Sequence, residues 1–287
     1  MRARPSGSIH VFGALALIVV AALVAAAVGA GAAGLHALSR GVGYADGVSA
    51  VARDPLLLAL AQLAGLVVAT GAGVLAAFGS DVTYREALDV RPVPAAIAVL
   101  ALTAGLSLQF PLHELANLLA ELDPSLGMDE MQQRQLRDFI RIDSALEAVT
   151  VPLAVVAIPA LSEELLFRGL LLPGLAKRYH PTVGLVLSSV LFGLIHWAPV
   201  AVAYATVAGF ALGWMRLKTG SVLPCIAMHG AFNAVPVLLP VELVRIEGFN
   251  TVGGEVYHLP LPLVVGAAVV AGACFFVIMR LTEEPEE

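Results

Sequence analysis

The chain has 287 residues, of which 59% are hydrophobic and 13% are charged, and its mean hydropathy is +0.89. Soluble domains contain about 45–50% apolar and about 25% charged residues, so this composition excludes an ordinary soluble domain and predicts an integral membrane protein. The net charge of −6 is spread without a basic cluster, which excludes a nucleic-acid-binding surface. The lipid bilayer is the first partner that the sequence predicts.

Eight apolar stretches have the length of about 17–25 residues that a membrane span requires. They are residues 11–34, 56–78, 94–112, 146–172, 182–198, 199–216, 221–240 and 259–280. Because the bilayer core offers the backbone no hydrogen-bond partner, these stretches are helices rather than strands. The sequence therefore predicts an all-α polytopic membrane protein with about eight transmembrane helices. Pro199 leaves almost no loop between the fifth and sixth stretches, which predicts a tight hairpin or a re-entrant piece there.

The first apolar stretch follows Arg2 and Arg4 and contains A-x-A-like sites, as a cleaved signal peptide does. Its length of about 25 residues exceeds the apolar core of about 7–15 residues that signal peptides have. We expect it to be retained as the first helix.

The lysines and arginines of the connecting segments indicate the orientation, because cytoplasmic loops carry an excess of them. With the N-terminus inside, the inner segments hold Arg2, Arg4, Arg85, Arg91, Lys177, Arg178, Arg216, Lys218 and Arg280, and the outer segments hold Arg40, Arg53, Arg134, Arg137, Arg141 and Arg245. This bias favours an N-in, C-in orientation. The Ala- and Gly-rich composition is typical of bacterial proteins, so we expect the bacterial inner membrane.

Residues 113–145 are the only sizeable extramembrane segment that the sequence predicts. Apolar residues recur at helical spacing on both sides of Pro124, which predicts two interfacial helices. His113 and Glu114 begin a HELAN sequence that lacks the second histidine of HExxH, so both are expected on the loop surface. One membrane domain then has three parts: 1–145, with the first helices and this loop, 146–240, with the polar motifs described next, and 241–287, with the last helix and an acidic tail.

Three charges interrupt the fourth apolar stretch at "LSEELLFRGLL". A charged residue near the bilayer centre costs about 2.5–3.5 kcal/mol, so it needs a partner or a function. Glu164 and Arg168 are four residues apart and can pair on one helix face. Glu163 lies about 100° away around the helix and has no local partner.

Two further polar pairs lie in later apolar stretches. Phe192 and His196, and likewise His229 and Asn233, are separated by four residues. Glu163, His196, His229 and Asn233 can therefore converge from three helices on one intramembrane cavity, where they would activate water and stabilise an oxyanion.

Each of these residues also has a structural interpretation. Glu164 with Arg168 can be an ion pair that only holds the helix, a lone histidine can be a packing residue, and Asn233 can join two helices. The spacing of Ala205, Gly209 and Gly213 favours a helix-packing seam. The two cysteines, Cys225 and Cys274, are expected to be packing residues without a disulfide.

Together these segments resemble the CPBP family, which includes the type II CAAX prenyl endopeptidases and the bacterial Abi membrane proteases. The EExxxR motif of that family matches Glu163, Glu164 and Arg168, its FxxxH motif matches Phe192 and His196, and its third motif matches His229 and Asn233. Three motifs in order are a far more specific signal than one, and the resemblance covers about residues 146–240.

The resemblance implies an intramembrane endopeptidase that acts on membrane-associated proteins or peptides. Glu163 would be the general base and His196 would bind or activate the water. His229 and Asn233 would hold the oxyanion, and Glu164 with Arg168 would support the site or orient the substrate.

Other functions stay open at this stage. The residues Glu163, His196, His229 and Asn233 could instead ligate zinc, although Asn is a poor zinc ligand, and we favour catalysis without a metal. A non-catalytic scaffold or bacteriocin-immunity factor that binds through residues 113–145 is a second possibility. A small transporter is a third, but no duplicated half supports it.

Overall fold

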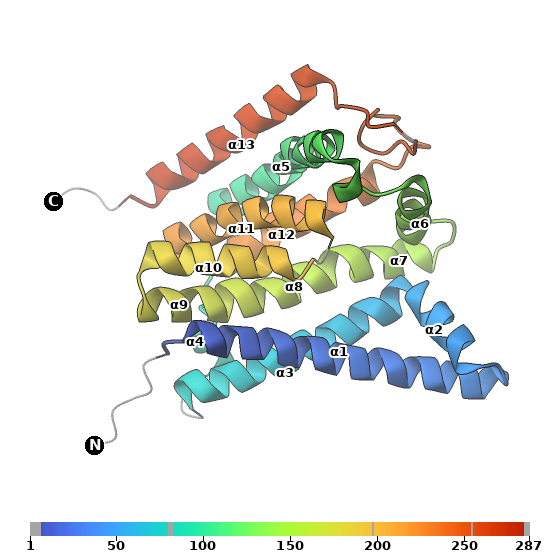
Figure 1. Cartoon of the computed structure of the whole chain (residues 1–287). Coiled ribbons are helices and arrows are strands. Elements are labelled where there is room, and N and C mark those ends of the chain that lie inside the picture. Colours follow the sequence, from blue (N-terminus) through green and yellow to red (C-terminus); the bar gives the residue numbers. More distant parts are fainter. Residues whose placement is uncertain (1–6, 80–82, 197, 254, 284–287) are drawn as a thin grey trace.

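The chain folds into helices joined by short turns and by two longer segments at one end (Figure 1). The computed structural model describes residues 7–79, 83–196, 198–253 and 255–283. Within these ranges it contains helices and no strand. The helices are α1 Val11–Arg40, α2 Tyr44–Ala52, α3 Pro55–Phe78, α4 Tyr84–Ala87, α5 Ala95–Leu122, the short 3₁₀ helix η1 Pro124–Leu126, α6 Glu130–Ile140, α7 Glu147–Pro152, the π-helix η2 Leu153–Ala157, α8 Ile158–Glu164, the π-helix η3 Leu165–Leu171, α9 Leu172–Arg178, α10 Pro181–Leu194, α11 Pro199–Thr219, α12 Leu223–Leu238 and α13 Leu261–Leu281.

Local signals set several of the helix ends. Asp54 caps α3 by accepting a hydrogen bond from the Leu57 backbone N–H at 3.1 Å, and Pro55 occupies the first turn, where no backbone donor is needed. Gly220 ends α11 in the left-handed region at φ 65°, which glycine adopts without steric cost. The start of α3 and the end of α11 therefore lie at residues that are typical helix caps.

Small residues let the helices pack closely. A Cβ added to Gly65 of α3 would lie 2.1 Å from the Ala21 carbonyl oxygen of α1, and one added to Gly105 of α5 would lie 2.1 Å from the Met228 carbonyl oxygen of α12. No side chain fits at such distances, so close helix contact depends on these glycines. Among these packed helices, α8 lies in contact with both α3 and α12.

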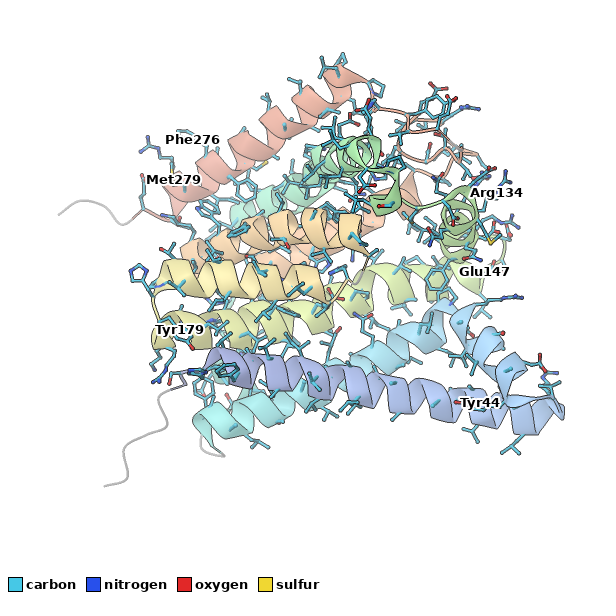
Figure 2. All side chains as sticks on the ribbon, viewed as in Figure 1. Tyr44, Arg134, Glu147, Tyr179, Phe276 and Met279 are labelled. Carbon is cyan, nitrogen blue, oxygen red and sulfur yellow. The ribbon has the colours of Figure 1, made fainter. Side chains whose placement is uncertain are left out.

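The molecule has two ends that differ in character. The start of α1 and the end of α13 lie at one end, which we call the terminal end, and Tyr179 lies there too (Figures 1 and 2). The opposite end, here the far end, carries α2, α6 and the segment 239–260, and the labelled residues Arg134 and Glu147 lie there (Figure 2).

All eight apolar stretches are helical, and this part of the prediction is confirmed. Six helices among the described residues are long and apolar enough to cross a membrane, counting the continuous run Glu147–Arg178 as one. The other two, Pro181–Leu194 and Leu223–Leu238, are shorter apolar helices. The chain is an integral membrane protein with six helices of spanning length among its described residues, and the count of about eight transmembrane helices stays a prediction. Of the charges used for orientation, Arg2 and Arg4 lie outside the described residues, as does most of the acidic tail.

Three predicted boundaries are wrong. The third stretch continues as α5 through Pro111 to Leu122, so His113 and Glu114 lie in a helix and not on a loop surface. His113 packs against the Phe249 ring with the centroids 4.9 Å apart. The segment 239–260 is a second sizeable connection at the far end. The fourth stretch continues beyond residue 172 to Arg178, so Glu163 lies at the middle of the run Glu147–Arg178.

Three other predictions are confirmed. The fifth and sixth stretches form a hairpin, since α10 ends at Leu194 and α11 starts at Pro199 and packs on it. The small-residue seam of α11 faces α10, because a Cβ added to Gly209 would lie 3.0 Å from Ser189 Cα. Cys225 and Cys274 are both free and buried.

Candidate active site

The charges of the EExxxR motif lie at the junction between α8 and η3, inside the bundle. Glu163 is 5% exposed, and Glu164 and Arg168 are fully buried. Arg168 belongs to the π-helical stretch η3, which begins directly after Glu164. Short π-helical stretches within α-helices often occur at functional sites. A sequence pattern based on 3.6 residues per turn does not reveal such a stretch.

Glu164 is the centre of a buried ion-pair network. Its Oε1 atom accepts a hydrogen bond from the Arg168 guanidinium at 2.8 Å, and the His229 Nδ1 lies 2.9 Å from the same oxygen. Arg168 also donates to the Gly209 carbonyl oxygen at 3.3 Å. The predicted pair therefore exists, and it joins η3 to α11 and to the histidine of α12. Both partners contact Oε1, and the Glu164 Oε2 atom is buried without a hydrogen-bond partner among the described residues. The ion pair with Arg168 stabilises the charged carboxylate of Glu164 and so weakens it as a base.

The Phe192 ring lies among the charged and imidazole groups. The Arg168 Cζ lies 4.1 Å from its centroid, which is a cation–π geometry. The centroids of the His196 and His229 rings lie 5.1 and 5.8 Å from it, both edge to face. Phe192 thus separates the two imidazoles and fixes their ring planes.

Both histidines are anchored through the same ring atom. The His196 Nδ1 lies 2.9 Å from the Phe192 carbonyl oxygen, and a carbonyl oxygen only accepts, so this nitrogen carries the proton. The His229 Nδ1 donates in the same way to the Glu164 carboxylate. In each ring Nε2 is then the nitrogen left for a ligand or a substrate.

Glu163 has a different partner, which the sequence analysis missed. Gln62 of α3 donates a hydrogen bond from its carboxamide to the Glu163 Oε1 atom. The Glu163 Oε2 atom is buried and has no hydrogen-bond partner among the described residues. A lone glutamine in the apolar stretch 56–78 is the one signal in the sequence, and without a known neighbour it is indistinguishable from a residue that joins two helices.

A cavity of about 290 Å³ lies beside these groups, and we call it the inner cavity. Its polar lining consists of Gln109, His196, Tyr204, His229 and Asn233, and the rest of its lining is almost entirely apolar. His196, His229 and Asn233 thus converge as predicted. Glu163 is not part of this lining, but Tyr204 lies within electrostatic range of its carboxylate.

A second buried arginine, Arg216, holds the backbone of η3 in place next to the site. Arg216 of α11 donates from Nε to the Arg168 carbonyl oxygen at 3.0 Å and forms an ion pair with Asp89. Arg216 is 6% exposed. The sequence analysis treated Arg216 only as a charge that indicates orientation, and here it fastens the η3 backbone to the turn that precedes α5.

The alternative zinc site does not fit this arrangement. Among the residues that the structure describes, no three His, Cys, Asp or Glu side chains are grouped as metal ligands. Glu163 bonds to Gln62 on α3, whereas His229 bonds to Glu164, so the four residues of the alternative do not form one donor set. We therefore derive no step through a metal.

The fold and the site together define a helical membrane protein with a buried carboxylate, guanidinium and imidazole cluster beside a cavity. The family described as type II CAAX prenyl endopeptidase Rce1-like matches residues 145–235, so this part of the chain is similar to that protease family. The three motifs all lie inside this range, and Gln62 and Gln109 lie outside it. No curated protein and no solved structure matches the chain.

Proposed function

We propose that the protein is an intramembrane endopeptidase that hydrolyses peptide bonds of membrane-associated proteins or peptides with water activated by Glu163. The observation that supports this most is the shared anchoring of His196 and His229 through Nδ1 beside one cavity, next to a buried glutamate with a free oxygen. A purely structural cluster would not require two imidazoles with the same atom left available.

The proposed reaction starts at the free oxygen of Glu163. Glu163 Oε2 accepts a proton from a water molecule that His196 Nε2 helps to hold. The water oxygen attacks the peptide carbonyl carbon, and the electron pair of the carbonyl bond moves to its oxygen. Asn233 donates to this oxyanion from its carboxamide, and His229 donates from Nε2 as an imidazolium whose Nδ1–H stays on Glu164. The tetrahedral intermediate collapses, the C–N bond breaks, and the proton on Glu163 passes to the leaving amine.

The other buried groups hold these residues in place. Gln62 restrains one carboxylate oxygen of Glu163 and leaves the other one for the water. Glu164 orients the His229 ring, and Arg168 balances the charge of Glu164 while it stacks on Phe192. Gln62 and Glu164 are thus positioning residues in this proposal.

The substrate class follows from the surroundings of the site. An apolar cavity inside a membrane protein is accessible to polypeptides that lie in or at the bilayer. Such substrates include C-terminal or signal segments of membrane-anchored proteins, with or without a prenyl group. The orientation that goes with the proposal is N-in, C-in in a bacterial inner membrane.

A comparison of membrane proteomes tests the proposal. Cells with the wild-type protein are compared with cells that carry Glu163→Gln, and new polypeptide termini are sought by mass spectrometry. Glu147→Gln is the matched control, because Glu147 starts the same continuous helical run at the far end. We expect cleaved termini with the wild type and the control but not with Glu163→Gln at equal abundance. Identical proteomes, with a cellular phenotype that Glu163→Gln still supports, would instead indicate a non-catalytic scaffold.

A further inference from the structure

The inner cavity shares part of its wall with a larger hollow at the far end. This hollow, here the vestibule, has a volume of about 1300 Å³ and is lined by α5, α6, the end of α12 and the segment 239–257. Leu136, Tyr204 and Phe232 line both spaces. We call this common region the neck, and through it the inner cavity adjoins the vestibule.

Gln109 of α5 also lines both spaces, and its carboxamide is not satisfied by the protein. The residue is 7% exposed, and its Oε1 atom is buried without a hydrogen-bond partner among the described residues. An unsatisfied buried acceptor costs about 1–3 kcal/mol, so this site favours a ligand that supplies a donor. A carboxamide offers both an acceptor and donors, which complement the N–H and C=O groups of a peptide backbone.

Contacts between segments distant in the sequence hold the vestibule together. Arg137 of α6 pairs with Glu242 at 2.8 Å, and the Gly253 backbone N–H donates to Gln133 at 3.2 Å. Asn117 of α5 donates to the Gly248 carbonyl oxygen at 2.8 Å. These contacts therefore hold the segment 239–257 against both α5 and α6, and they keep the walls of the hollow in place.

The dimensions and chemistry of the vestibule indicate what it accommodates. Its volume exceeds the range of about 300–1,000 Å³ that is usual for small-molecule pockets. Arg137 and Arg141 on its wall are paired with carboxylates, and the wall also carries the carboxylates Asp129 and Glu255, so its charges do not favour an anionic ligand. Leu136, Ile140 and Phe232 make its inner part apolar. An extended polypeptide with apolar side chains matches these properties better than a small polar metabolite.

We infer that the vestibule is the substrate channel of the protease, that it admits an extended apolar polypeptide segment from the far end, and that Gln109 binds the backbone of this segment at the neck. The inference rests on the proposed function. Because the far end lies opposite the start of α1 and the end of α13, an N-in, C-in orientation makes the channel open on the outer face of the membrane. The substrates are then segments that reach this face.

Single cysteines test the direction and the use of the channel. The chain has two cysteines, both buried, and Cys225→Ala with Cys274→Ala gives a cysteine-free background. Ser125→Cys places a thiol in the vestibule wall, and Lys218→Cys places one at the terminal end as the matched control. We expect a membrane-impermeant maleimide to label intact cells at position 125 and to stop cleavage. Position 218 is expected to react only in permeabilised cells and to leave cleavage unchanged.

A kinetic measurement tests the neck. With a peptide that spans a cleavage site found in the proteome comparison, Gln109→Leu is expected to raise KM about tenfold while kcat changes less than twofold, since about 1.4 kcal/mol of binding corresponds to tenfold. Normal cleavage by protein labelled at position 125, labelling of this position only from the inside, or an unchanged KM for Gln109→Leu would overturn the inference. Absence of cleavage by unlabelled wild-type protein would overturn the proposed function itself, so the two failures are distinguishable.

Discussion

The interior and the far end both contain ion pairs, but the same chemistry has different consequences in the two places. Arg168 and Glu164 are fully buried, and their pair joins η3 to α12 through His229. Arg134 and Glu130 on α6 have side chains that are 66% and 48% exposed. A buried charge that loses its partner stays desolvated, whereas an exposed one returns to water. The buried pair therefore fixes the geometry of the interior, whereas the exposed pair of α6 can be lost at little cost in stability.

The largest expected effect concerns catalysis in the interior. Glu163→Gln removes the proposed general base, which typically contributes about 10²–10⁴-fold to the rate. We expect kcat on a peptide substrate to fall by this factor, with KM nearly unchanged, because the substitution preserves the shape of the side chain. The far-end counterpart Glu147→Gln is expected to keep wild-type kcat, because Glu147 is not among the residues that line the vestibule or the inner cavity. Equal activity of both variants would remove Glu163 from the mechanism.

The next effect concerns the stability of the two ion pairs. Arg168→Met leaves Glu164 buried without its guanidinium, and breaking a buried pair typically costs about 3–5 kcal/mol. Arg134→Met is expected to leave the midpoint of thermal unfolding unchanged, because both partners are well exposed. Thermal unfolding in detergent, followed by circular dichroism, compares the two variants. A similar midpoint for both would contradict the contrast between the two regions.

A smaller effect is expected at Gln62. A hydrogen bond to a charged group typically contributes about 1.5–3 kcal/mol, so its loss in Gln62→Met corresponds to about 10- to 100-fold in kcat. Since Gln62 touches Glu163 and not the cavity, KM should stay the same. Thr70→Val is the control, because Thr70 is buried on the same helix and its hydroxyl has no hydrogen-bond partner among the described residues. If both variants lower kcat equally, Gln62 is only a structural residue of α3.

The smallest effect is a pH dependence at the far end. A hydrogen bond to Glu114, supported by the charges of Glu114 and Glu121, raises the pKa of His258 above its ordinary value of 6.5. The protonated imidazole thus stabilises the contact between α5 and the start of α13. This stabilisation is complete below about pH 6.5 and is lost as the pH rises through the raised pKa.

Thermal unfolding midpoints of the wild type and His258→Gln, measured between about pH 5.5 and about pH 8.5, test this dependence. The difference between the two proteins is expected to shrink as the pH increases. A difference that is independent of pH would show that the His258 charge contributes nothing.

The sequence by itself determined the helical membrane class and the residues with polar chemistry. Apolar stretches, and charged residues within them, can be read from neighbouring positions of the sequence. The length of a membrane span and the pairing of residues i and i+4 then follow from the geometry of a single helix. For this reason the eight apolar helices and the Glu164–Arg168 pair were predictable, and the family match on residues 145–235 agrees with the three motifs.

Only the tertiary structure decided which partners these residues have. His229 bonds to Glu164 rather than Glu163, Gln62 comes from a helix about one hundred positions away, and α5 continues through Pro111. These outcomes depend on how helices rotate and approach one another, which is set by close contacts such as those of Gly65 and Gly105. No local pattern contains that information, because the energy of a contact between two helices depends on the residues of both helices.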